Sequence, residues 1–470
     1  MATQTGLTAK SVKGLGGLRL IPRIDTFPRV VLFVQTPLGK IVLLALFGAG
    51  LFYFFPDWPS VLTLLLPLAL ISFLPEYRRF VLALSPIALL VMQTTGDPVL
   101  LGSSLFVIAL GVFLYGCAMR FPHSQFGQRP VAFLLAGFSA LIVLAGIAAP
   151  HSLPYTILWG LVGALASYVW FIAYAVTDRN SKPAGELTLE LTAFHPLWGS
   201  TGTPFPKGAA YLRRIEAKTA EQLAVYQLKG LKLLAWAIIL GVFQAQWWKF
   251  FHGFLRIPTA EQALAMSVHR TPVAWHLCWE SLILAFFELI LWISIMGHRI
   301  IACCRMAGFN ALRNTYRPLS STTVMEFFNR FYYYFKELLV DLFFYPAFLR
   351  YWKGNKRMRM AFATAAAAFF GNGLYHFTRD WQIIQNLGLW KALVNYQTMF
   401  FYNALLTAAL CISQLRIRKK KPLGLFRRQI LPSLGVVAFY LLLSVFEISE
   451  RVYPLVEHFR FFASLFFIHF

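Results

Sequence analysis

A single histidine in an apolar, alanine-rich stretch is the strongest candidate for chemistry in this sequence. His376 lies in the run AFATAAAAFFGNGLYHFTRDW, and an ionisable side chain in such a run is a functional candidate by default because its burial is costly. Gly371 and Gly373 flank Asn372 and permit a distorted turn or the close approach of a ligand. A neutral imidazole held there could take a proton from a hydroxyl nucleophile. A structural histidine that hydrogen-bonds a neighbouring helix is the alternative interpretation.

A second polar stretch lies upstream of this histidine. Asn329, Tyr332 and Lys336 are spaced i, i+3 and i+7, so they share one face if the stretch is a single helix. We predict that this face lines the cavity that His376 enters. The alternative without a functional role is a membrane-surface helix whose charges lie in water and whose aromatic rings face lipid. The whole stretch 326–350 mixes charges with aromatic residues, so we expect an interfacial or re-entrant helix pair broken at Pro346.

Other polar residues in apolar runs suggest further roles. His276 and Glu280 are four residues apart and can share a helix face, and Glu288 lies deeper in the same run. A proton- or ion-coupled site is one interpretation of these three residues, and a structural hydrogen bond is the other. We expect hydrogen-bonding links between helices from the amides of the run 392–415, which are Asn395, Gln397 and Asn403.

Composition sets the context for these residues. The chain has 470 residues, of which 58% are hydrophobic and 13% charged, whereas soluble domains carry about 25% charge. One polytopic membrane body is therefore favoured over several soluble domains. The 43 Lys and Arg outnumber the 19 Asp and Glu. Because the basic residues sit between apolar runs, they indicate cytoplasmic loops held against anionic lipid, and no nucleic-acid partner is expected.

The apolar runs predict an all-α fold with about eleven transmembrane helices plus re-entrant or interfacial helices. The runs are 41–56, 58–75, 80–96, 98–119, 130–177 (two spans), 233–248, 277–298, 360–378, 392–415 and 429–446. The distribution of Lys and Arg over the loops places the N-terminus in the cytoplasm. Four regions are expected: a basic cytoplasmic segment 1–40, a bundle of about six spans 41–177, a cytoplasmic loop with an amphipathic helix 178–232, and a membrane core 233–470.

Two short elements share their order and spacing with a known family. Residues 314–318 read NTYRP, residues 326–332 read EFFNRFY, and Asp341 follows nine residues after Tyr332. Residues 372–377 then read NGLYHF. These elements resemble the N-F-x-x-P, D-F-W-x-R-W-H and S-G-L-W-H-G motifs of the membrane-bound O-acyltransferase (MBOAT) family, in the bacterial branch that modifies alginate or teichoic acid. His376 matches the family's second histidine, whereas Tyr332 occupies the position of the first.

The resemblance implies transfer of an acyl group, such as acetyl, from a thioester donor to a hydroxyl of a glycan, lipid or other acceptor. The donor would be acyl-CoA or an acyl carrier, and the location a bacterial inner (plasma) membrane, in contact with membrane lipids. No bound cofactor and no metal site are expected. The residues assigned in this way are His376 as general base, Asn329 or Tyr332 for the acceptor or the oxyanion, and Asn372, Asn314, Lys336 and Arg330 for substrate binding.

Two other functions stay open at this point. A transporter or flippase would use Glu280, Glu288 and His276 as coupling groups. A non-catalytic assembly subunit related to the family would use its basic loops as docking sites, and substitution of His376 would not change its phenotype.

Overall fold

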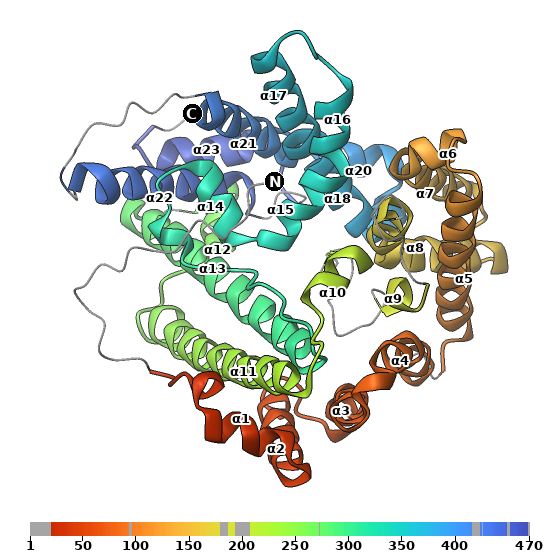
Figure 1. The fold of residues 1–470 in the computed structure, drawn as a ribbon. Helices are drawn as coiled ribbons and strands as arrows, with labels where there is room; N and C mark the ends of the chain where they lie inside the picture. The colour runs from red at the N-terminus through yellow and green to blue at the C-terminus, as the bar shows by residue number, and fades with distance from the viewer. Residues whose placement is uncertain are drawn as a thin grey trace.

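The computed structural model describes residues 20–93, 96–178, 187–192, 207–271, 273–415, 424, 426–448 and 452–468. These residues form α-helices joined by shorter 3-10 and π-helical turns, and they contain no β-strand beyond one isolated bridge between Glu216 and Phe309 (Figure 1). The predicted all-α fold is confirmed. Three regions discussed from the sequence lie outside the described residues: the basic residues at 1–19, most of the loop 179–206 and the basic run 416–423.

In the part of the chain that the structure describes, six helices are long and apolar enough to cross a membrane, which indicates an integral membrane protein. They are Pro98–Arg120 (α5), Pro130–Ile147 (α7), Leu153–Asp178 (α8), Ala220–Phe254 (α11 and the π-helical η5), Trp275–Met306 (α13) and Phe426–Phe446 (η9, α22 and η10). Two sharply bent pairs raise the number to eight, namely Pro28–Gln35 with Pro37–Phe52 (α1 and α2, 97°) and Trp58–Phe73 with Pro75–Ile87 (α3 with η3 and α4, 118°). The count of eleven spans predicted from the sequence is therefore too high for the described residues.

Helix length and helix breaks account for the difference. Helices α2 and α3 have 16 residues each, so at about 1.5 Å per residue they fall short of a hydrocarbon core roughly 30 Å thick. The run 392–415 is divided between α20 (Leu389–Asn395) and α21 (Gln397–Leu415). The run 360–378 belongs to a helix that begins at a basic cluster and contains Asn372 and His376, which make it less apolar.

The remaining helices are short and connect or cover the long ones. They are α4 (Arg78–Gln93), α6 (Gln125–Gln128), α9 (Leu187–Thr192), α10 (Ala209–Ile215), α12 (Ala260–Val268), α14 (Val324–Phe331), α15 (Tyr333–Leu339), η7 (Val340–Phe344), α16 (Tyr345–Arg350), α17 (Lys356–Ala365), η8 (Ala366–Gly371), α18 (Asn372–Arg379), α19 (Trp381–Leu387) and α23 (Leu455–Ser464). The predicted amphipathic helix after residue 208 is present as α10 and the first turns of α11.

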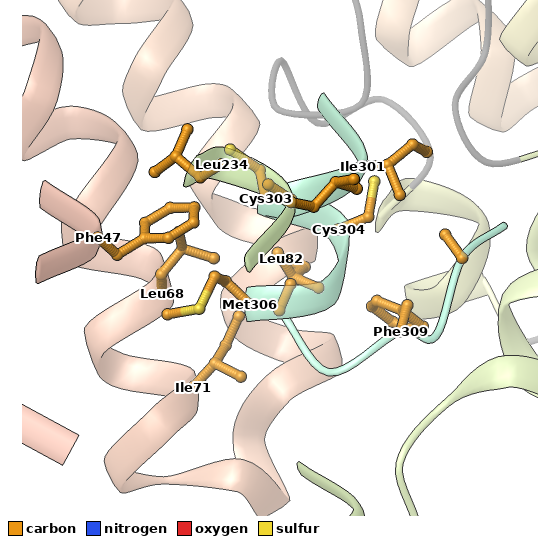
Figure 2. Packing of buried hydrophobic residues seen from close by; sticks show 14 of the residues in the cluster. Phe47, Leu68, Ile71, Leu82, Leu234, Ile301, Cys303, Cys304, Met306 and Phe309 are labelled. Carbon is orange, nitrogen blue, oxygen red and sulfur yellow. The ribbon is translucent and has the colours of Figure 1, made fainter. Parts of the chain in front are cut away.

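Long helices α11 and α13 lie side by side and form the central scaffold (Figure 1). A first buried cluster joins helices α1 to α4 to helix α11 and to the C-terminal end of α13. Figure 2 shows its packing, in which Phe47 and Leu68 lie on the side of Leu234 and Met306 and Ile301 lies on the other side of the end of α13. The N-terminal helices therefore pack on α11 and the end of α13.

A second buried cluster joins α5, α7 and α8 to helices from the C-terminal half. Trp170 of α8 packs against Phe343 of η7 and Tyr375 of α18, with ring centroids 6.0 and 6.1 Å apart. Residues of the predicted first bundle, 41–177, are thus divided between two clusters. Each cluster includes residues from 233–470, so both parts build one body.

Two helices with π-helical turns carry the candidate site. The first runs through α15, η7 and α16 without interruption, and the second through α17, η8 and α18. The predicted break at Pro346 is wrong, because the helix continues through this residue and the chain breaks at Tyr332 instead. Pro346 follows the π-helical turn, where the backbone carbonyls depart from α-helical spacing, so its ring is tolerated. A Cβ atom on Gly371 would lie 2.7 Å from the Phe343 ring, so these two π turns touch.

Candidate functional site

A cavity of about 430 Å³ lies between α13, α14, α18, α21 and α22. Aromatic and aliphatic side chains form most of its wall, including Phe286, Trp292, Phe328 and Leu406. The polar lining residues that are not tyrosines number five: Asn372, His376, Arg379, Ser444 and Glu447. A concave, mainly apolar space with a few converging polar groups is the usual form of a ligand site.

Three residues that the sequence analysis singled out meet at this cavity. Tyr332, Asn372 and His376 all line it. Asn372 and His376 both belong to α18 and are four residues apart, so they share one face of the helix. The π-helical turn η8 ends at Gly371, immediately before them. The distorted turn expected near Asn372 is therefore present, and such turns often occur at functional sites.

The backbone at Tyr332 explains how its ring reaches the cavity. Helix α14 ends at Phe331, and Tyr332 has φ −138° and ψ 72°, outside the helical region. The chain then enters α15 in a new direction. Because of this break, Asn329 and Lys336 do not share a helix face with Tyr332, and the predicted polar stripe is wrong. Neither Asn329 nor Lys336 is among the described residues that line the cavity.

Asn314 fixes the start of α15 through two hydrogen bonds to its backbone. Its side chain is buried, and its Oδ1 accepts a hydrogen bond from the Tyr334 backbone N–H at 3.2 Å. Its backbone carbonyl accepts from the Tyr333 N–H at 3.0 Å. Asn314 therefore fixes the chain just after Tyr332, and it is not among the residues lining the cavity. Its place in the structure is that of a positioning residue for this turn.

The two cations predicted to bind substrate, Arg330 and Lys336, are already paired with carboxylates. Arg330 forms an ion pair with Glu326, with Nη2 and Oε1 2.6 Å apart, and donates from Nη1 to Ser320 Oγ at 2.7 Å. Lys336 forms an ion pair with Glu337. A phosphate would have to compete with these partners.

Lys207 extends the charged group around Lys336 and was not singled out from the sequence. Its Nζ lies 2.6 Å from Glu337 Oε2 and 2.7 Å from Asp341 Oδ2. The hydroxyl of Tyr174 donates to Asp341 at 3.3 Å. Burial lowers the pKa of Lys207, but the two carboxylates outweigh burial and the pKa is raised. Because Lys207 lies 130 residues from Glu337 along the chain, no local pattern could predict the pair.

Glu288 has a partner that the sequence analysis did not identify. His252 Nε2 lies 2.9 Å from Glu288 Oε1, and His252 Nδ1 lies 2.7 Å from the Ile257 carbonyl oxygen. The carbonyl only accepts, so Nδ1 donates this hydrogen bond, and Nε2 is the ring atom that faces the carboxyl group. His276, which was grouped with Glu288 as a possible coupling residue, is exposed at the start of α13.

Asn403 of α21 contacts the cavity wall through Asn372. The Asn372 Nδ2 atom donates a hydrogen bond to Asn403 Oδ1 at 2.6 Å. The predicted role of Asn403 as a hydrogen-bonding link between helices is confirmed.

Among the residues described, no group of three or more His, Cys, Asp or Glu side chains is arranged to hold a metal ion.

Comparison with known proteins adds no family to this geometry. No family model matches the chain, and no curated protein is similar to it at a significant level. Functional inference therefore rests on the cavity itself and on the two short motifs.

Proposed function

We propose that this chain is a membrane O-acyltransferase in which His376 acts as the general base. The observation that carries the proposal is that Tyr332, Asn372 and His376 share one mainly apolar cavity among membrane-type helices. Of the described residues that line this cavity, His376 is the single imidazole. An imidazole is the side chain best suited to accept and return a proton near neutral pH.

The proposed reaction uses the cavity as follows. The apolar wall holds the acyl chain of a thioester and excludes water. The imidazole of His376 removes the proton from the acceptor hydroxyl as its oxygen attacks the thioester carbonyl. The tetrahedral intermediate collapses, the carbon–sulfur bond breaks, and the proton passes from the imidazolium to the leaving thiolate. A positioned hydroxyl such as that of Tyr332 is suited to donate to the developing oxyanion.

The motif resemblance supports this reaction class. Tyr332 stands where the MBOAT motif has its first histidine, and His376 stands where it has the second. By that resemblance the donor is acyl-CoA or an acyl carrier, and the acceptor is a glycan or lipid at a plasma membrane with the N-terminus in the cytoplasm. The mainly apolar wall also favours an acyl donor over a wholly polar substrate.

Acyl transfer by the purified protein tests the proposal. The protein, in lipid nanodiscs, is supplied with radiolabelled acetyl-CoA or palmitoyl-CoA and with a cell-envelope extract as acceptor. We expect wild-type transfer and a loss of about 10²–10⁴-fold for His376→Gln, the usual contribution of a general base. His276→Gln is the matched control, because this histidine is exposed and lies outside the cavity. A His376→Gln rate within threefold of the wild type, in folded protein, would reject the catalytic role of His376, whereas no transfer by the wild type would favour a non-catalytic assembly subunit.

Proton-coupled transport is a second candidate, and the His252–Glu288 pair favours it. Side chains in this pair are 5% and 19% exposed, and their 2.9 Å contact joins two helices of membrane type. Proteoliposomes that take up solute in response to a pH gradient, with no thioester present, would support this function. Uptake should then disappear in Glu288→Gln and persist in His376→Gln.

A further inference from the structure

Two buried amides form one contact at the cavity wall, and among the described residues neither Asn372 Oδ1 nor Asn403 Nδ2 has a hydrogen-bond partner. Asn372 and Asn403 are 3% and 0% exposed. The Asn372 Nδ2 donates to Asn403 Oδ1 at 2.6 Å, and no residue that the structure describes donates to Asn372 Oδ1. Asn372 is also one of the cavity-lining residues.

An unpaired carbonyl oxygen in such a place needs a physical explanation. Buried acceptors in proteins nearly always receive a hydrogen bond, because an unpaired one loses its hydration without compensation. The exceptions are often positions at which a ligand supplies the missing group. Here the oxygen belongs to a residue that lines a cavity, so a molecule inside that cavity can supply the missing donor.

The Asn372 amide lies close to His376, the proposed base. Asn372 and His376 are one turn apart on α18, which puts their Cβ atoms about 5–6 Å from each other. In this arrangement the Asn372 amide donates to Asn403 through Nδ2, which leaves Asn372 Oδ1 without a donor among the described residues. A Cβ atom on Gly373 would lie 3.6 Å from Asn403 Nδ2, so α18 and α21 are in contact at this point.

We propose that Asn403 is a positioning residue that presents Asn372 Oδ1 as a hydrogen-bond acceptor to the substrate. The cavity then selects a molecule with an O–H or N–H group about one helical turn from the hydroxyl that His376 deprotonates. This inference rests on the proposed acyltransferase function. Two substrates carry such a group: an acceptor with a second hydroxyl, and a thioester donor with the amide N–H groups of a pantetheine arm.

Matched substrates separate these two sources. The acceptors are octyl β-D-glucopyranoside, which has several hydroxyls, and 1-octanol, which has one; the donors are decanoyl-CoA and the simple thioester S-octyl decanethioate. The protein is kept in lipid nanodiscs, and the KM of each substrate is measured for the wild type and for Asn403→Leu. Loss of one neutral hydrogen bond corresponds to about a threefold to tenfold rise in KM.

Each arm has a distinct expected result. If the acceptor binds Asn372, Asn403→Leu raises the KM of the glucoside and leaves that of 1-octanol unchanged. If the donor binds Asn372, the variant raises the KM of decanoyl-CoA and leaves that of the simple thioester unchanged. A variant that lowers only the thermal stability or the folded yield, with every KM unchanged, would overturn the inference while the proposed function stands. Absence of transfer by the wild type would overturn both.

Two further variants distinguish a change in substrate binding from an effect on folding. Asn403→Asp retains an oxygen that accepts from Asn372 Nδ2, so its KM values should stay within about twofold of the wild type, a change smaller than loss of one hydrogen bond. Thr407→Val removes another buried hydroxyl without a described partner, one turn further along α21 and outside the cavity lining. Its KM values should not change. Equal losses in Asn403→Asp and Asn403→Leu would show a merely structural role and contradict the inference.

Discussion

Phe335 packs against both Tyr332 and His376. Its ring centroid lies 5.4 Å from that of Tyr332 and 6.5 Å from that of His376, where the two rings meet edge to face. The ring also contacts Tyr375 at 4.6 Å, and the residue is 5% exposed. One buried ring therefore connects the helix that begins after the break at Tyr332 with the helix that carries the imidazole.

Phe335→Leu should reduce acyl transfer more than it reduces stability. The smaller side chain loosens the contact with His376, and a misplacement of about 1 Å at a reacting group can cost roughly 10²-fold in rate. Phe335→Ala should in addition destabilise the fold by about 3–5 kcal/mol, as expected for a buried phenylalanine. The measurements are kcat and thermal unfolding in nanodiscs. Phe113→Leu on α5 is the control, since this ring is 65% exposed; full activity of Phe335→Leu would show that the ring does not position His376.

Glu216 should stabilise the protein at neutral pH and not at acidic pH. It pairs with Arg79 at 2.8 Å and Arg78 at 3.4 Å, and Lys218 lies 3.2 Å away. Burial alone would raise the pKa of Glu216, but the three cations outweigh burial and lower it. A carboxyl with a lowered folded-state pKa contributes stability above its unfolded pKa, and this contribution is lost as pH falls through the folded value.

Glu216→Gln therefore should lower the unfolding temperature by several degrees at pH 7. Removing one partner of a buried ion pair typically lowers the free energy of unfolding by about 3–5 kcal/mol. The difference between wild type and variant should shrink as the pH falls below about 4, near the ordinary pKa of a glutamate. A difference that stays the same from pH 7 to pH 3 would contradict the ionised state assigned to Glu216.

Glu190 should behave in the opposite way. Burial raises its pKa to about 9, the Asp178 carboxylate adds to the rise, and Arg213 offsets part of it. Both carboxyl oxygens are buried, and an interaction with the Ala209 backbone N–H also offsets part of the rise. Since the folded protein holds a proton that the unfolded chain releases above its ordinary pKa, stability falls as the pH rises from that value toward 9.

Glu190→Gln should accordingly stabilise the protein, and by more at pH 9 than at pH 5. The amide imitates the protonated carboxyl group and has no proton to lose. Thermal unfolding of both proteins across this pH range checks the prediction. A stabilisation that does not grow with pH would show that Glu190 is ionised in the folded protein.

His252 and Glu288 should act as one unit in holding η5 against α13. Removing one member leaves the other buried and poorly paired, so His252→Phe and Glu288→Gln should each lower the unfolding temperature. The double variant should be destabilised by clearly less than the sum of the two. Glu280→Gln, on the same helix α13, is the control and should change little. Additive effects in the double variant would show that the 2.9 Å contact contributes nothing.

Three of the seven residues that the sequence suggests for the site line one cavity, and the other four do not. Residue type and setting predict His376 and Asn372, and helical spacing with the motif resemblance predicts Tyr332; the structure brings these three to one cavity. Asn329 and Lys336 were chosen by helical spacing, which fails because the chain breaks at Tyr332. The segment 326–339 contains no Gly or Pro, and its amphipathic pattern continues across the break. Only tertiary contacts, such as those of Asn314, determine where that helix is interrupted.

Long-range partners were also beyond the reach of local patterns. Asn403 was correctly expected to link helices, yet its partner Asn372 lies 31 residues away and could not be named. His252 lies in a mixed connecting segment without helical periodicity that would point it at Glu288. The span count failed for a related reason, because an uncharged run shows that a segment is buried or lipid-facing but not how long its helix is. The 16-residue helices α2 and α3 illustrate this.

Chemical rescue at position 376 tests the central claim most directly. His376→Gly removes the side chain, and the transfer rate from labelled acyl-CoA is measured with and without added imidazole in nanodiscs. We predict a loss of about 10²–10⁴-fold in the variant, and recovery of at least tenfold when imidazole fills the vacant place, with greater recovery above the pKa of free imidazole. A variant that transfers acyl groups at the wild-type rate without imidazole would contradict the assignment of His376 as the base.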